Sequence, residues 1–158
     1  MKINIYAVGK VKGSLLLSVQ EYLKMISKYT DIEVIEIKEE TITAKASEKS
    51  VAKALNLEGE AILKRINDKD YVFVLAPNGE KLDSITFSER LNDAFNVGQS
   101  RVSFIIGSSH GLSNNIYTRA NKILSFSDLT FPHQLFRIIL LEQIFRAFKI
   151  INKETYHK

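Results

Sequence analysis

One short run of consecutive apolar residues, YVFVLA at 71–76, most constrains how this chain can fold. An uninterrupted apolar run of this length is typical of a parallel strand covered on both faces. A second buried strand, RVSFIIG, is predicted at 101–107, and further strands are predicted at 2–8, 31–37 and 123–127. Helical spacing of apolar residues is found between these strands. The alternation predicts a single α/β domain over 1–158, with a mostly parallel sheet flanked by helices.

The helices are expected at 14–29, at 47–66 with a break or weak point near Gly59, and at 88–98, 113–122 and 133–151. Gly59 is treated as a weak point because glycine disfavours a helix interior. The segment PNGEKL at 77–82 is predicted to be a turn.

Three of the predicted strands are followed by loops that would open at one edge of the sheet. These loops follow 71–75, 102–106 and 123–127. In parallel sheets, ligands bind at the carboxyl ends of the strands, so this edge is the predicted binding site. Gly107 and Gly111 in the second loop permit close approach of a ligand, although a tight turn without any ligand explains them equally well. The chain has no G-x-G-x-x-G and no phosphate-loop motif, which disfavours dinucleotide-dependent dehydrogenases and P-loop nucleotidases.

Composition excludes several kinds of site. The chain has no cysteine, so disulfides, thiolate zinc sites and a cysteine nucleophile are ruled out. The three histidines, His110, His133 and His157, lack the spacing of a metal site, and no metal is expected. The start of the chain does not resemble a signal peptide, and no apolar run approaches the ~20 residues that span a bilayer, so a cytoplasmic location is expected. Residues 1–30 carry five lysines and one glutamate, a balance compatible with RNA as partner.

The last predicted helix is apolar around most of its circumference. Twelve of the seventeen residues from Leu135 to Ile151 are apolar, more than a helix on one sheet face needs. A homodimer through this helix is the economical explanation, and burial within a single chain is the alternative. Arg137 lies one turn into this helix and requires an anion, either a carboxylate or a phosphate of a ligand.

The segments MKINIYAVGK, IIGSSHG, LSFSDLTFPHQLFRIILLEQIFRAFKI and the terminal YHK together resemble the RlmH family of SPOUT-class ribosomal RNA methyltransferases. The resemblance extends over the whole chain. It implies a SPOUT-type α/β knot, in which the C-terminal segment forms a trefoil knot, and a homodimer with the knot helix in its interface. The implied activity is methyl transfer from S-adenosyl-L-methionine to N3 of a pseudouridine in 23S rRNA of the assembled 70S ribosome. Neither a metal, nor DNA, nor a membrane is implied.

The resemblance also implies roles for individual residues. The methyl donor is expected to lie among the three strand-end loops, on Leu75, Gly107, Phe126, Ser127, Asp128, Leu129, Thr130 and Phe131. His133 or His157 is expected to handle the N3 proton of the acceptor. Arg137 is expected to bind the RNA backbone or the base, and Tyr156 to stack on or orient the uracil ring. The C-terminal tail completes the site across the dimer in this interpretation.

Lys10 and Lys12 are candidates for contacts with RNA phosphates, although solvated lysines beside a turn are the commoner case. Three other functions compete with this interpretation. The first is a SPOUT enzyme that acts on another RNA such as tRNA. The second is a non-catalytic ribosome-assembly or RNA-binding factor. The third is a nucleotide-binding enzyme of another reaction class, which the missing phosphate loops disfavour.

Overall fold

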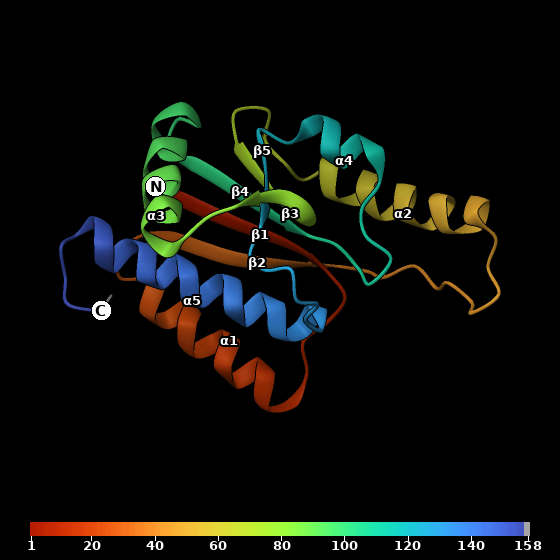
Figure 1. Cartoon of the computed structure of the whole chain (residues 1–158), viewed down its shortest axis with the longest axis horizontal. Coiled ribbons are helices and arrows are strands. Elements are labelled where there is room, and N and C mark those ends of the chain that lie inside the picture. The colour runs from red at the N-terminus through yellow and green to blue at the C-terminus, as the bar shows by residue number, and fades with distance from the viewer. Residues whose placement is uncertain (157–158) are drawn as a thin grey trace.

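A computed structural model describes residues 1–156 and shows five parallel strands flanked by five helices (Figure 1). The strand order is β2-β1-β4-β3-β5, and every pair of neighbouring strands is parallel. This confirms the α/β class predicted from the sequence. The strands are β1 (Lys2–Val8), β2 (Asp31–Ile37), β3 (Tyr71–Lys81), β4 (Arg101–Ile106) and β5 (Lys122–Ser125). The helices are α1 (Gly13–Ile26), α2 (Glu48–Leu63), α3 (Ser84–Val97), α4 (Asn114–Arg119) and α5 (His133–Ile151).

Side chains alternate between the two faces of the sheet and build two separate cores. In β1, Ile3 and Ile5 are buried in the core formed with α1, α3 and α5. The intervening Tyr6 is buried in the opposite core, which also contains Ile62 of α2 and Ile116 of α4. Figure 1 shows the same division, with α1, α3 and α5 on one side of the sheet and α2 and α4 on the other. Burial on both faces explains why the inner strands are apolar along their length.

Strand β3 continues through the segment that the sequence predicted to be a turn. Its register with β5 shifts, because Leu124 is opposite both Leu75 and Glu80. A Cβ on Gly79 would overlap the backbone of Leu124. The glycine therefore permits close approach of two strands, and residues 76–79 bulge out of the ladder rather than ending the strand.

Helix α2 runs without a break through Gly59, so the predicted weak point is wrong. A Cβ at this position would overlap Ser113 Oγ, at the start of α4. Because Gly59 has no side chain, α2 and the start of α4 can pack closely, and this packing outweighs the low helix propensity of glycine.

Helix α5 lies between α1 and α3 on one face of the sheet (Figure 1). Leu140, Leu141 and Ile144 are fully buried there. Two neighbouring helices and the sheet thus cover most of the broad apolar surface of α5, which is the single-chain alternative considered above. The homodimer stays a prediction. Within residues 1–156, no helix combines the length and the apolar character needed to cross a membrane.

Candidate functional site

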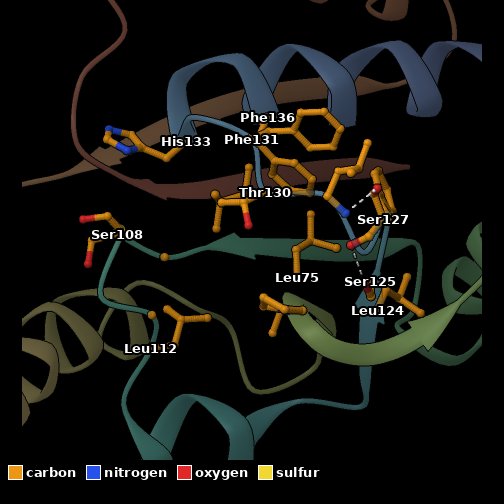
Figure 2. A pocket seen from close by; sticks show the side chains of 18 of the residues that line it. Leu75, Ser108, Leu112, Leu124, Ser125, Ser127, Thr130, Phe131, His133 and Phe136 are labelled. Carbon is orange, nitrogen blue, oxygen red and sulfur yellow. Dashed lines mark hydrogen bonds between the residues drawn. The ribbon is translucent and has the colours of Figure 1, made fainter.

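The three loops at the carboxyl edge of the sheet enclose one cleft of about 570 Å³. Two of them follow β4 and β5, as the sequence predicted, and the third is the bulge at residues 76–79 inside β3, where the sequence had predicted the end of that strand. All eight residues expected to hold the methyl donor line this cleft, and so does His133. Figure 2 shows His133 at one end of the cleft and Ser125 and Ser127 at the other.

The inner wall of the cleft is apolar. Leu75, Ile106 and Leu124 lie in three neighbouring strands at this edge, and each is at most 7% exposed. Phe126 extends this wall, because its ring packs against Phe136 at 5.6 Å between centroids. A wall of this kind excludes water and favours the flat, apolar faces of a ligand.

Residues 125–131 form the irregular side of the cleft and hold their shape by local hydrogen bonds. The Ser125 hydroxyl donates to the carbonyl of Ser127 at 3.2 Å, and the Leu129 N–H donates to Ser127 Oγ at 2.9 Å. Asp128 forms an exposed ion pair with Lys81 at 2.5 Å. These bonds hold the loop in place although it has no regular secondary structure. Leu129 is 72% exposed at the rim of the cleft.

The glycines of the second loop serve a tight turn that also lines the cleft. A Cβ on Gly107 would lie 2.6 Å from the carbonyl oxygen of Gly111 and 2.7 Å from Leu112 Cγ. Gly111 has a φ of +95°, which favours glycine. The two explanations weighed from the sequence, a tight turn and a close approach to a ligand, are therefore compatible at this loop.

His133 begins α5 and lies against the turn that follows β1. Its Nε2 is 3.3 Å from the point where a Cβ on Gly9 would lie. Gly9 has a φ of +92°, so this turn needs a glycine both for its backbone conformation and for the space. Of the four predicted catalytic residues, His133 is the one that lines the cleft in residues 1–156.

Arg137 is buried beneath the site, and its partners lie in this chain. Its side chain is 2% exposed, and its Nη1 donates to Glu36 Oε2 at 3.2 Å. Its Nη2 donates to the carbonyl of Gly9 at 3.1 Å. Burial lowers the pKa of the guanidinium, and the hydrogen bond and charge of Glu36 oppose that shift. Of the two anions that the sequence left open, the structure supplies the carboxylate, and a direct contact of Arg137 with RNA does not fit this burial.

Tyr156 lies along α5 rather than in the cleft of its own chain. Its hydroxyl donates to Glu142 Oε1 at 3.3 Å, and the Arg146 guanidinium lies 4.8 Å from its ring centroid. Glu142 follows His133 by nine residues, which is about 13 Å along a helix. The structure therefore does not bring Tyr156 together with His133 within one chain. The remaining catalytic candidate, His157, lies outside the described residues.

Sequence reasoning missed two acidic residues near this edge. Glu36 is the partner of Arg137, but nothing in the alternating pattern of 31–37 distinguishes it from the exposed Glu33. Glu58 is 3% exposed and accepts a hydrogen bond from the Glu40 N–H at 2.9 Å. Burial raises the pKa of its carboxyl, and the backbone hydrogen bond opposes the shift. No group of three or more potential metal ligands is found within residues 1–156.

Comparison with known proteins gives full-length matches. A family model described as "Predicted SPOUT methyltransferase" matches residues 1–157. Proteins named "Ribosomal RNA large subunit methyltransferase H" from Clostridium tetani and Enterococcus faecalis are 46% and 43% identical to this chain. Both matches cover 100% of this chain and 100% of the relative.

Among solved structures, a probable methylase family protein from Haemophilus influenzae has a similar fold, with a TM-score of 0.55 at 12% identity. The match covers 99% of this chain and 70% of that protein. At this identity the likeness concerns the fold alone. The full-length matches in sequence carry the assignment: the chain belongs to the SPOUT methyltransferase family, together with the proteins named ribosomal RNA large subunit methyltransferase H.

Proposed function

We propose that this protein transfers a methyl group from S-adenosyl-L-methionine to N3 of a pseudouridine in 23S rRNA of the assembled 70S ribosome. The observation that carries the proposal is the full-length similarity to proteins named for methylation of large-subunit ribosomal RNA. The cleft at the carboxyl edge supports it, because a site of this shape lies where parallel α/β sheets bind their ligands.

The residues of the cleft fit a methyl donor of this kind. Leu75, Leu124 and Phe126 offer apolar surface to a flat adenine ring. Residues 126–131 have no helix or strand, so backbone N–H and C=O groups other than the bonded Leu129 N–H and Ser127 carbonyl can bind the polar edge of the adenine. Gly107 allows the backbone of the second loop to approach closely. When bound, the donor supplies an electrophilic methyl carbon.

The protein itself contributes alignment and proton handling. Holding the acceptor nitrogen in line with the methyl carbon contributes on the order of 7–11 kcal/mol to lowering the barrier. The N3–H of the acceptor must lose its proton as the new N–C bond forms, and we assign that proton to His133 at the end of the cleft, with His157 as the other candidate. Alignment is the larger of these two contributions.

We propose that the tail works in the cleft of a second copy of the chain. Tyr156 bonds to Glu142, which lies about 13 Å along α5 from His133, so we infer that these two side chains of one chain do not act on the same base. A homodimer through the start of α5 resolves this, because Leu135 and Leu129 remain exposed there. Tyr156 would then orient the uracil ring from the partner. The trefoil knot belongs to the same proposal: α5 follows the edge strand β5 and yet lies between α1 and α3.

Lys10 and Lys12 are the proposed contacts with RNA phosphates, beside the same edge of the sheet. Since ribosomes are the proposed substrate, the cytoplasm is the proposed location. Neutralising each lysine is expected to weaken ribosome binding. The slope of log affinity against log salt concentration should become shallower by about one unit for each lysine.

The proposal is tested by incubating the protein and S-adenosyl-L-methionine with unmethylated ribosomes, free 23S rRNA and tRNA. Mass mapping of the modified nucleotides should find one methylated pseudouridine in 23S rRNA, and only with ribosomes. Methylation of tRNA instead would favour the other SPOUT activity. The absence of donor binding in calorimetry, together with binding to ribosomes, would favour a non-catalytic factor.

A further inference from the structure

Three side-chain hydrogen bonds hold the turn after β1, two with residues at the start of α5 and one with Glu36 of β2. The Gly9 carbonyl accepts a hydrogen bond from Arg137, and the Gly9 Cα faces the His133 ring. Two residues later, the Val11 N–H donates to Glu36 Oε2 at 3.1 Å, the same oxygen that accepts from Arg137. The Lys12 N–H donates to Gln134 Oε1 at 3.3 Å. The position of this turn is thus set by the first turn of α5 and by the end of β2.

The arginine at the centre of this network is costly to bury without its partners. Its Nε has no hydrogen-bond partner in the part of the chain that the structure describes, although the atom is buried. A buried charge is tolerated only where hydrogen bonds and an opposite charge offset its loss of water. Arg137 therefore depends on Glu36 and Gly9, and conversely holds both of them in place.

The strand order places this turn next to the donor cleft. Strand β1 is the neighbour of β4, whose loop contains Gly107, and the cleft extends from there across β3 and β5. His133 lines the cleft, and its Nε2 is also 3.3 Å from the point where a Cβ on Gly9 would lie, so it lies between the cleft and the turn. In Figure 2, His133 and Ser108 lie toward the same end of the cleft, away from Ser125. The space beside this end is where an acceptor base can meet the donor.

We propose that the Gly9 turn forms the acceptor side of the active site, and that Arg137 and Glu36 are positioning residues that hold it against His133. The inference rests on the proposed methyl transfer. In that reaction the N3–H proton moves to His133, the N3–C bond forms, and the C–S bond breaks with its electron pair left on sulfur. Movement of the turn by even a fraction of an ångström changes the path between His133 and the acceptor.

Two glycines of the same connection provide a matched pair of variants. Gly9→Ala and Gly13→Ala each place a Cβ on a residue with positive φ, at +92° and +61°. The new Cβ lies 3.3 Å from His133 Nε2 at Gly9, whereas at Gly13 nothing lies within 4 Å. We expect Gly9→Ala to lower the single-turnover rate on ribosomes by at least about tenfold, with the donor dissociation constant within about twofold of wild type. Gly13→Ala should keep both values near those of wild type. Equal rates for the two variants would overturn the proposal.

Two glutamates of β2 provide the second pair. Glu36→Gln removes the charge beside Arg137, and Glu33→Gln removes a charge that pairs with Lys2 at 2.9 Å, at the amino end of the strand. Glu36→Gln should lower the maximal rate about tenfold without changing donor affinity, and Glu36→Asp, which keeps the charge, should recover part of the rate. Glu33→Gln should behave as wild type. Loss of donor affinity in parallel with the rate, or no recovery by Glu36→Asp, would overturn the positioning role.

The contact itself can be measured without any turnover. The imidazole resonances of His133, assigned with His133→Gln, should shift in Gly9→Ala and Glu36→Gln and stay unchanged in Gly13→Ala and Glu33→Gln. If the wild-type protein methylates no RNA, the proposed function fails while this comparison still tests the contact. If wild type is active and all four variants give unshifted His133 resonances, the inference fails alone. Should Glu36→Gln fail to fold, Arg137→Lys tests the same contact, because it keeps the charge and removes the fork that joins Glu36 to Gly9.

Discussion

The carboxyl edge of the sheet carries an open apolar cleft, whereas the amino edge carries a smaller polar hollow. At the carboxyl edge, the bulge of β3 and the loops after β4 and β5 leave a cleft of about 570 Å³ with apolar walls. At the amino edge, a smaller hollow of about 240 Å³ is lined mainly by polar residues that bond to one another. There Arg119 Nη2 donates to the carbonyl of Asp70 at 2.9 Å, and Asn121 Oδ1 accepts from the Val72 N–H at 2.8 Å. The amino edge is thus closed by internal bonds, and the carboxyl edge is left open for a ligand.

Each edge contains an arginine–carboxylate pair in which one partner is buried, and the buried partner differs. At the amino edge the carboxylate of Asp70 is buried, with 1% exposed, while the Arg101 side chain is 36% exposed. At the carboxyl edge Arg137 is buried and the Glu36 side chain is 39% exposed. The same kind of pair thus joins two strands at the amino edge and holds the Gly9 turn at the carboxyl edge.

The largest effect is expected at the amino edge. Asp70→Ala removes the acceptor for Arg101 Nε and for the buried Ser103 hydroxyl, both at 2.6 Å. The free energy of unfolding, measured with urea, should fall by about 3 kcal/mol, because buried polar groups lose their partner. Donor affinity of the folded protein, measured by calorimetry, should be unchanged. A parallel loss of affinity would show that the two edges are not independent.

The next largest effect is expected at the carboxyl edge, where donor affinity should fall more than the free energy of unfolding. Gly107→Ala forces the second loop to move, since its Cβ would lie 2.6 Å from the Gly111 carbonyl oxygen. Donor affinity should fall about tenfold, or about 1.4 kcal/mol, with a smaller change in stability. Gly111→Ala is the control, because it has positive φ but open space around the new Cβ. Equal losses of affinity would mean that backbone strain, rather than close packing, controls this loop.

A pH-dependent effect is expected from Glu58, a buried acid with no ion pair among residues 1–156. Its carboxyl has a pKa raised above 4.5 by burial, so its contribution to stability is present below pH 4.5 and is lost as the pH rises through the folded-state value. Glu58→Gln should therefore raise the free energy of unfolding at pH 7, because the folded state no longer buries an ionised carboxylate. The gain should vanish in urea unfolding at acidic pH. A gain that is the same at both pH values would point to packing rather than charge.

The smallest effect is expected from the irregular loop of the cleft. Ser127→Ala removes the side-chain acceptor of the Leu129 N–H. The loop should hold its shape less firmly, and donor affinity should fall by about twofold to threefold, as for one exposed hydrogen bond. Thr118→Ala is a matched control, because the Thr118 hydroxyl bonds to the Asn114 carbonyl on an exposed helix face. An equal change in donor affinity for both variants would show that the hydrogen bond between Ser127 and Leu129 has no specific effect on donor binding.

Local patterns along the chain are enough to predict the order of the elements and the edge of the sheet at which the cleft lies. Apolar periodicity is a local property, so the limits of β1, β2 and α5 agree with those predicted. The carboxyl ends of parallel strands lie at one edge of a sheet. The sequence alone therefore predicts that three segments far apart in the chain meet at one cleft.

The partners of the individual polar residues, in contrast, follow from tertiary contacts. Arg137 and Glu36 are 101 residues apart, and no local pattern pairs them. The continuity of α2 through Gly59, and of β3 through residues 77–81, depends on packing against Ser113 and Leu124. The position of Tyr156 beside Glu142 likewise depends on where the tail folds back. Such contacts depend on the final packing of distant segments, which propensity and spacing along the chain do not encode.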